Sequence, residues 1–347
     1  MPYIVCVGTV YIDTILSVPH FPPEDSKQRA DNVVRRRGGN PGNTLEVLSR
    51  LLPAANLNPA TSSYTTALFL LAPLPDPAAD DTHCIVASLP DVSTRLYLYR
   101  RGHTRAASCY VLASAARGSR TCVSYDPLPG LSVAEFVEKM EALVHAQSEE
   151  VWVHFEGRGG GVLVGCMEWL RQRFGWHGRV RVSLECENPA RGELARVLPL
   201  ADVVFYSRAW AEAFRDPANG LPVLPASFLH SQMPLTAPTA TLICTWGPDG
   251  AEALRNGTND RPIHATANAW RPRAPVGSVA LPVDTVGAGD TFIAGMLYAL
   301  VQQPAWGLDQ RLAFANELAG RKVYQEGFQG LGEAMRGGEW GERMGER

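Results

Sequence analysis

The nine residues DTVGAGDTF (284–292) decide how this chain is interpreted. The GAG triplet (287–289) is followed at once by Asp290, and the next run, FIAGMLYALV (292–301), is apolar nearly all round. Such a run predicts a buried helix. The amino end of a helix presents unpaired backbone N–H groups and partial positive charge, and glycine lets an anion approach that backbone closely. The stretch therefore predicts an anion-binding helix start with a carboxylate beside it.

A carboxylate beside an anion site places a proton acceptor next to a bound phosphate. This arrangement suits the transfer of a phosphoryl group to an alcohol. The GAGD residues by themselves leave a structural alternative equally open, in which a glycine turn leads into a helix and Asp290 is a first-turn aspartate favoured by the helix dipole. The flanking pairs Asp284-Thr285 and Thr291-Phe292 favour phosphoryl transfer, because of a resemblance described below.

The composition is that of a globular protein with a large core. The chain has 347 residues, 46% of them hydrophobic, which is enough for one large α/β domain or a domain with an insertion. The formal charge of −3 argues against a nucleic-acid partner. A small basic run, RRR at 35–37, adjoins a glycine pair and is interpreted as a solvated strand end.

The cysteines and the apolar segments indicate the cellular setting. Seven cysteines are scattered without a C-x-x-C pair, and most lie in apolar stretches, as is typical of reduced core residues. A strand-like run begins by Tyr3, so no signal peptide is expected, and no apolar segment approaches the roughly 20 residues of a membrane span. The sequence predicts a cytoplasmic protein with no membrane partner.

Short β-branched runs alternate with helical patterns along the chain. Continuous apolar strands separated by helices predict an α/β fold with a mainly parallel sheet covered on both faces. The expected strands are 4–8, 151–155, 180–184, 202–206 and 241–245, and the expected helices are 133–145, 163–174 and 190–198.

Two segments break this alternation. Residues 11–36 and 95–125 are strand-like without an intervening helix, and we expect them to form one small antiparallel sheet that acts as a lid. Segments 215–240 and 255–280 are rich in proline and small residues and are expected to be loops. The main domain is expected to span 1–330, and the polar, glycine-rich end (331–347) to be a flexible tail.

Polar residues follow several of the expected strands, where open parallel sheets bind ligands. Asp13 is as consistent with a turn cap as with a ligand contact, whereas Arg158, just past a strand end, favours a phosphate contact. Glu185 and Glu187 alternate on a strand and so point the same way. They fit either a water-bound Mg²⁺ or an ordinary surface salt bridge.

The stretch GGNPGN (38–43) precedes an amphipathic helical pattern. Asn40 is a good N-cap and Pro41 a good first helical residue, so structure alone explains part of it. Its amides also suit sugar hydroxyls, because an amide both donates and accepts hydrogen bonds. Walker A, HExxH, zinc-ligand and GxSxG patterns are absent, which argues against P-loop nucleotide binding and against hydrolases.

With these motifs in order, the chain resembles the ribokinase-like (PfkB) sugar kinases, and within that family the ketohexokinase group. The resemblance covers most of residues 3–330, and DTxGAGDxF is its most specific part. The matching stretches are CVG with Asp13, P-x-E-D-S (22–26), RGGNPGN (37–43), GSRT (118–121), HFEGR (154–158), DVVFYS (202–207), CTWGPDGAEAL (244–254), VDTVGAGDTF (283–292) and AGRK with QEGFQG (319–330).

The resemblance implies a ribokinase-like fold and a role for each matching residue. It implies that Asp290 is the catalytic base, that the backbone of Gly287, Ala288 and Gly289 is an anion hole, and that Arg120 is a lid arginine near the reacting groups. The residues implied to bind the sugar are Asp13, Asp25, Gly39, Asn40 and Asn43, and those implied to bind ATP are Arg158, Arg208, Trp246, Gly250, Thr285 and Arg321.

One family feature is missing. Ribokinases have an N-x-x-E motif that organises Mg²⁺ through water, and the equivalent stretch here is SRAW (207–210). Glu185 and Glu187 are the candidate substitutes for Mg²⁺, and K⁺ is a further candidate cofactor. Residues 52–95 fit the family loosely, so the substrate is less well defined than the reaction.

The resemblance implies ATP-dependent phosphorylation of a sugar hydroxyl, with fructose converted to its 1-phosphate as the first hypothesis. The alternatives are a ribokinase, a 6-fructokinase or a nucleoside kinase of the same family, and a non-catalytic sugar- or nucleotide-binding protein. A lid with one face over the sugar leaves its other face and edges uncovered, so we expect a homodimer through the lid, as the resemblance also implies.

Overall fold

The architecture was obtained from a computed structural model of the chain. It describes residues 2–52, 66–116, 119–145, 149–176, 178–215, 220, 223–257, 261–273 and 280–336.

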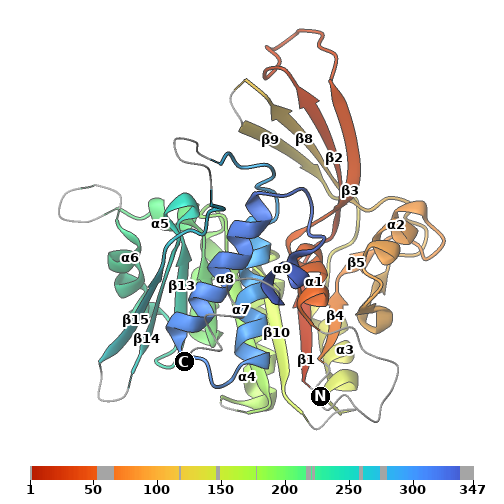
Figure 1. Cartoon of the computed structure of the whole chain (residues 1–347). Coiled ribbons are helices and arrows are strands. Elements are labelled where there is room, and N and C mark those ends of the chain that lie inside the picture. Colours follow the sequence, from red (N-terminus) through yellow and green to blue (C-terminus); the bar gives the residue numbers. More distant parts are fainter. Residues whose placement is uncertain are drawn as a thin grey trace.

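A nine-stranded sheet forms the centre of the molecule, in the order β15-β14-β13-β12-β11-β10-β1-β4-β6 (Figure 1). The strands from β13 to β6 are all parallel, and five of them were expected from their continuous apolar runs, whereas β4 and β6 were not; β14 and β15 are antiparallel at one edge. The bounds are β1 Tyr3–Val7, β4 Ala67–Leu71, β6 Val92–Ser93, β10 Val151–Glu156, β11 Val180–Cys186, β12 Val203–Tyr206, β13 Thr241–Thr245, β14 Ala251–Asn256 and β15 Pro262–Ala267.

Helices cover both faces of this sheet because its strands bury alternate residues in two cores. In β1, Ile4 and Cys6 belong to one core, whereas Val5 and Val7 belong to the other. The first core is covered by α1 (Asn40–Leu51), α2 (Asp80–Ser88), α7 (Ala288–Gln302), α8 (Leu308–Val323) and α9 (Leu331–Arg336), and the second by α3 (Val133–His145), α4 (Gly160–Phe174), α5 (Arg208–Glu212) and α6 (Pro225–Gln232).

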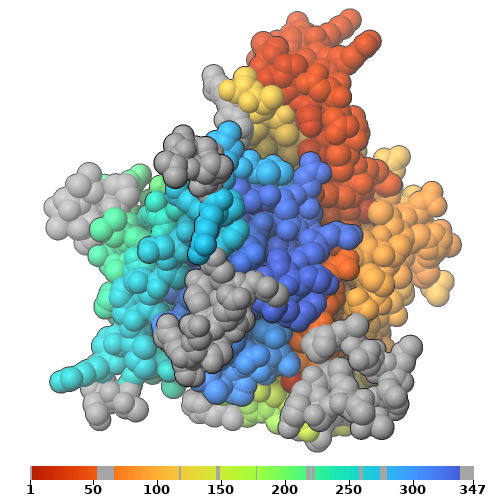
Figure 2. Space-filling model, in the orientation of Figure 1, coloured from red at the N-terminus to blue at the C-terminus, as the bar shows by residue number. Residues whose placement is uncertain are grey.

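A separate four-stranded sheet, the lid, projects from the main body (Figures 1 and 2). Its strands are β2 (Tyr11–Val18), β3 (Asn32–Gly38), β8 (Ala107–Ser114) and β9 (Ser119–Tyr125), in the order β3-β2-β8-β9. The lid is mixed rather than antiparallel, because its central pair, β2 and β8, is parallel. Both strands run outward from the main body, and β3 and β9 are their antiparallel return strands.

The second lid segment is shorter than expected. The part from 95 to 106 lies in the body, where β7 (Leu98–Tyr99) pairs with β5 (Pro73–Leu74), and residues 117–118 lie outside the described residues.

Three other expectations from sequence are wrong. The helix expected at 190–198 is a short 3₁₀ turn at Gly192–Arg196, because Gly192 weakens a helix and Pro199 restricts the residue before it. The loops expected at 215–240 and 255–280 contain α6 and β15 respectively. Prolines begin both elements, Pro225 at a first helical position and Pro262 in an edge strand, where proline is tolerated.

The expected tail begins too early. Residues 331–336 form α9, which packs on α1 and buries Leu331 and Met335. Arg336 fixes the helix further by donating to the carbonyl oxygens of Arg50 and Leu51, both at 3.3 Å. Residues 337–347 lie outside the described part of the chain. Among the described residues, no helix is both long and apolar enough to cross a membrane.

The packing of α9 gives a stability prediction. Because Leu331 is fully buried, Leu331→Ala should lower the free energy of unfolding by about 2–5 kcal/mol. Glu333→Ala on the exposed side of α9 should change it by no more than about 0.5 kcal/mol. Urea denaturation of both variants measures this. Equal, small effects of the two would show that α9 does not contribute to the folded core.

Candidate active site

A cavity of about 550 Å³ lies between the lid and the carboxyl ends of the central strands. The lid contributes Asp13 and Arg120, and the body contributes Glu185, Asp290 and the 287–289 backbone. Alternation along the strands places every second lid residue toward this cavity. The sequence-predicted residues that line the cavity are Asp13, Gly39, Asn40, Asn43, Arg120, Arg158, Glu185, Glu187, Thr285, Gly287, Ala288, Gly289 and Asp290.

The two glycines of the GAG triplet are explained by different features of the structure. Gly287 caps α7 with φ 78°, and a methyl group there would lie 2.6 Å from Cζ of Phe328. Both the backbone and the packing therefore require glycine at 287. A methyl group at Gly289 would meet no described atom within 4 Å beyond its own helix turn and neighbours. The space over the 289 amide is thus open to a ligand at the positive end of a helix.

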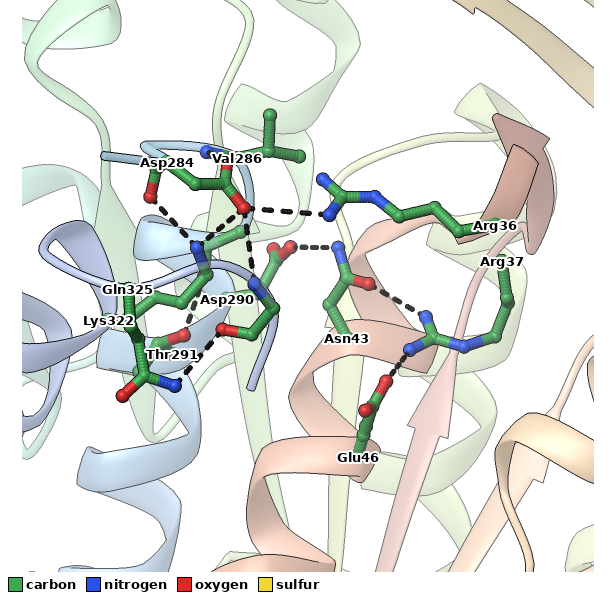
Figure 3. A network of polar contacts seen from close by, with 12 residues as sticks. Arg36, Arg37, Asn43, Glu46, Asp284, Val286, Asp290, Thr291, Lys322 and Gln325 are labelled. Atoms are coloured by element: carbon green, nitrogen blue, oxygen red, sulfur yellow. Dashed lines mark hydrogen bonds and ion pairs between the residues drawn. The ribbon is translucent and has the colours of Figure 1, made fainter. Parts of the chain in front are cut away.

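Asp290 lies in the first turn of α7 and is only 6% exposed. Its Oδ2 accepts a hydrogen bond from Asn43 Nδ2 at 2.7 Å (Figure 3). Burial raises the pKa of Asp290 to about 7; the Asn43 hydrogen bond opposes this shift, the charges of Glu187 and Glu156 add to it, and Arg37 opposes it. A carboxyl group with this pKa can both accept and release a proton near neutral pH.

A buried arginine stands behind Asn43. Arg37 Nη1 donates to Asn43 Oδ1 at 2.7 Å, and Nη2 pairs with Glu46 (Figure 3). Arg37 Nε donates to Ser88 Oγ at 3.1 Å. The side chain of Arg37 is 2% exposed. The interpretation of the RRR run as a solvated strand end is therefore wrong at Arg37, because β3 enters the body at its carboxyl end and carries this side chain inward.

A second polar network fixes the loop before α7. Lys322 on α8 is fully buried. Its Nζ donates to the backbone carbonyl oxygen of Asp284 at 2.8 Å and to Asp284 Oδ2 at 2.9 Å. Asp284 Oδ1 accepts from the backbone N–H of Val286 at 2.9 Å. Arg36 on lid strand β3 reaches Asp284 Oδ2 at 3.5 Å (Figure 3). The loop that leads to the GAG triplet is thereby tied to both α8 and the lid.

Polar groups for a small neutral ligand surround the same cavity. Burial raises the pKa of Asp13, and the charges of Arg36 and Arg37 lower it. Asn40 Nδ2 donates to Glu185 Oε2 at 3.0 Å and to Glu187 Oε2 at 3.5 Å. The two glutamates therefore point the same way, as the sequence indicates.

Glu185 and Glu187 are the pair that bears on a metal ion. Glu185 is buried, and its pKa is raised well above the usual range by burial and by the charges of Asp290 and Glu187. A bound cation would favour the ionised form of Glu185, and the carboxylate oxygens of the pair fit Mg²⁺ held through water. Within the described ranges, no three His, Cys, Asp or Glu side chains are close enough to hold a metal ion directly.

Arg158 lies at the cavity edge but is engaged by the protein. Its Nε donates to Glu156 Oε1 at 2.8 Å, and its guanidinium lies 5.6 Å from the ring centroid of Tyr11. Glu156 is itself buried and accepts the backbone N–H of Thr9 at 2.9 Å. The position just past β10 is as expected, and Arg158 lines the cavity.

A second, more apolar cavity of about 540 Å³ adjoins the first and shares Thr285, Ala288 and Gly289 with it. The residues that line it include Gly250, Trp270, Ala319, Gly320 and Tyr324. An apolar slot that opens onto the 287–289 amides has the shape of a site for a flat ring bearing phosphates.

Four sequence-predicted residues do not line either cavity. Asp25 is exposed in the β2–β3 loop at the lid tip, with a left-handed φ of 57°. Arg321 stacks on Trp270, with 4.6 Å between its guanidinium carbon and the ring centroid. Arg208 lies 5.2 Å from the ring centroid of Trp246, so these two pack on one another beside the site. The structure therefore brings 14 of the 18 predicted residues to the cavity walls.

Several lining residues were not found from the sequence. Cys109, Cys122 and Ser124 face the first cavity from the lid, and their small polar side chains carry no pattern of their own. Trp270 and Asn316 line the second cavity, and the expectation of a loop at 255–280 concealed Trp270. The register of β2 against β8 would have identified Cys109, because it lies beside Asp13 on the neighbouring strand.

Proteins of known structure share this fold and arrangement of layers. Ribokinase from Giardia lamblia superposes with a TM-score of 0.70 at 15% identity, with 94% of each chain covered. Ribokinase from Cryptococcus neoformans var. grubii serotype A, in complex with ADP, gives a TM-score of 0.64 at 16% identity, covering 95% of this chain and 96% of that one. The fold is therefore that of the ribokinase-like α/β kinases.

The sequence comparison defines the family. The chain is 31% identical to mouse (Mus musculus) ketohexokinase over 333 residues, which is 94% of this chain and 98% of that protein. The sequence model of the pfkB family of carbohydrate kinases matches residues 1–333. The chain thus belongs to the pfkB family of carbohydrate kinases.

The two glycines of the triplet make a matched pair of variants. Gly287→Ala should lower the free energy of unfolding by about 1–3 kcal/mol, because of the left-handed φ and the Phe328 contact. Gly289→Ala should leave stability unchanged or slightly raised, and should still abolish most MgATP-dependent turnover by filling the open space. Thermal melts and a phosphorylation assay measure both. Full turnover in Gly289→Ala would exclude an anion over this amide.

Proposed function

We propose that the protein transfers the γ-phosphoryl group of ATP to a sugar hydroxyl, with fructose O1 as the first candidate acceptor. One observation carries this proposal: Ala288 and Gly289 line both of two adjoining cavities, and Asp290, the next residue of α7, lines the first. One cavity is polar and covered by the lid, and the other is an apolar slot. That junction suits a reaction in which a phosphorylated ring and an alcohol meet beside a proton acceptor.

Each cavity is assigned one substrate. The adenine of ATP would occupy the apolar slot near Trp270 and Tyr324, with its phosphates over the 287–289 amides. The sugar would lie under the lid, where Asp13 and Asn40 offer acceptors and donors to its hydroxyls. Arg120 faces the same cavity from β9 and would contact the phosphoryl group between the two substrates.

Asp290 would accept the proton of the attacking hydroxyl. Phosphoryl transfer has a loose transition state, so positioning and charge neutralisation supply most of the acceleration. The helix end and Arg120 provide positive charge, and burial keeps water from the reacting atoms. Glu185 and Glu187 would hold Mg²⁺ through water, and that ion would supply further charge neutralisation for the phosphates.

The ketohexose assignment is supported by the 31% identity to mouse ketohexokinase, which spans nearly all of both chains. The family also leaves ribose, the C6 hydroxyl of fructose and nucleosides as alternatives, with a non-catalytic binding protein as the remaining one. The buried, intact Asp290 favours an enzyme, because a binding protein has no need for a desolvated carboxylate.

A panel of acceptors tests the proposal. We expect ADP release from MgATP with fructose, with NMR of the product identifying the 1-phosphate. Ribose, 6-phosphorylation and adenosine are the alternative outcomes, each of which would move the substrate while keeping the reaction class. Absence of turnover with every acceptor would contradict the kinase proposal.

The Asp290→Asn variant tests the proton acceptor. Turnover should fall at least about 100-fold, because general-base catalysis contributes roughly 10²–10⁴-fold, while ATP affinity should be kept. In the unmodified protein, kcat/KM should decline as the pH falls through about 7, since protonation of Asp290 removes the acceptor. Near-normal turnover in the variant would exclude this role.

We also propose that two copies pair through the outer face of the lid. Alternation and register place Val33, Tyr110, Val123 and Tyr125 on the face opposite the cavity, and each of these side chains is at least 47% exposed. Strand β9 is an edge strand with every residue exposed. An apolar face beside an open edge favours a self-complementary interface.

Light scattering at micromolar concentration measures the pairing. We expect a dimer for the unmodified protein and a monomer for the double variant Val123→Glu and Tyr125→Glu, because two buried carboxylates per protomer oppose apolar contact. Glu333→Gln on the distant helix α9 serves as the control. A monomeric unmodified protein with full activity would contradict the proposed interface.

A further inference from the structure

The three consecutive arginines of β3 contact different residues. Arg35 pairs with Asp81 on α2 and is 54% exposed, whereas Arg36 reaches Asp284 in the loop before α7. Arg37 points inward and donates to Asn43, Glu46 and Ser88. Of the three, only Arg37 contacts a residue that in turn contacts Asp290.

We propose that Arg37 is a positioning residue that orients the carboxylate of Asp290 through the side-chain amide of Asn43. The inference rests on the proposed role of Asp290 as proton acceptor. It assigns Asn43 to the relay behind that carboxylate, in addition to any contact with the sugar.

The argument begins with the two ends of an amide. Asn43 presents a carbonyl oxygen on one side and an NH₂ group on the other. Arg37 has donors only, so its Nη1, at 2.7 Å, can be satisfied only by the oxygen end. The NH₂ end is thereby directed to Asp290 Oδ2, also at 2.7 Å. Without Arg37, the amide could turn over and present its oxygen to the carboxylate, which would repel it.

Arg37 is itself held rigidly. The ion pair with Glu46 and the bond to Ser88 fix its planar fork, and both partners lie on elements other than β3, namely α1 and α2. Asn43 is on α1 as well, and its backbone N–H is bonded to the Gly39 carbonyl at 3.0 Å. A side chain with three satisfied directions holds its neighbour to within a fraction of an ångström, and a misplacement of 1 Å near reacting atoms can cost about 100-fold in rate.

Arg37 also differs in sign from the other charges around Asp290. Glu156 on β10, Glu185 on β11 and Glu187 just beyond it act on Asp290 with negative charge, and Arg37 on β3 acts with positive charge. Loss of the guanidinium should therefore make the carboxyl harder to ionise. Arg37→Lys, which keeps a positive charge, separates this loss of charge from the loss of the oriented amide.

The test compares Arg37→Met and Arg37→Lys with the matched control Arg35→Met on the same strand. We expect Arg37→Met to lower kcat by about 10–100-fold with KM for ATP within about twofold, and to shift the acid limb of kcat/KM to higher pH. Arg37→Lys keeps the positive charge but lacks the planar guanidinium, so kcat should fall while the acid limb of the kcat/KM profile shifts less. Arg35→Met should leave kcat and the limb unchanged.

Two further variants separate positioning from folding. Glu46→Gln keeps the Arg37–Asn43 bond, so it should lower the melting temperature while leaving the acid limb in place. If Arg37→Met does not fold, Asn43→Ala cuts the same relay at its next link and should also shift the limb upward. An acid limb that stays fixed in Arg37→Met and in Asn43→Ala would overturn the proposal.

A readout without activity keeps this proposal distinct from the proposed function. A ¹³C NMR titration of the Asp290 carboxyl should show a higher pKa in Arg37→Met than in the unmodified protein or in Arg35→Met. Absence of sugar phosphorylation by the unmodified protein would contradict the kinase, and this titration would still measure the relay. An unchanged Asp290 titration in Arg37→Met would overturn the relay even in an active kinase.

Discussion

The buried hydrogen bond from the Asn43 side chain to the Asp290 carboxylate joins the amino ends of α1 and α7 at the candidate active site, and a second, from Thr44 Oγ1 to the Asp290 carbonyl oxygen at 3.4 Å, supports it. Both helices begin at a glycine that no other residue could replace without strain, Gly39 with φ 94° and Gly287 with φ 78°. Two positive helix ends therefore converge on one cavity, and the carboxylate between them is oriented by an amide rather than by a charge. The sheet positions α1 and α7, and the lid lies over their amino ends. The loop that Lys322 holds at Asp284 leads into α7.

This arrangement buries several carboxylates with few cations among them. Asp290, Glu185 and Glu156 are all largely buried, and burial raises the pKa of the first two. A folded protein tolerates such a cluster at a cost in stability, and ligands that bring positive charge relieve it. The same desolvation that weakens the fold raises the pKa of Asp290 to about 7, which suits its proposed role as proton acceptor.

The sequence predicted the parts of the fold that local patterns control. Five of the seven parallel strands were found because both of their faces are buried, so their apolar runs are continuous, and α3 was found over its full length. Strands β4 and β6 were missed. Strand β15 and helix α6 were missed because prolines begin them and tertiary packing, rather than propensity, holds them in place. In the site, the glycine motifs placed their residues on the cavity walls. The burial of Arg37 depends on where β3 meets α1, which no short pattern indicates. The same holds for the stacking of Arg208 on Trp246 and of Arg321 on Trp270.

The parallel pairing of β2 with β8 has a consequence for how the chain assembles during synthesis. The two strands lie roughly a hundred residues apart, so the hairpin of β2 and β3 leaves the ribosome long before its partner exists. Throughout that interval the nascent chain carries an unpaired inner strand edge and an uncovered apolar face, the features that promote association with other chains. The lid sheet is thus complete only once β9 has been synthesised, and its β2–β3 hairpin needs protection until then.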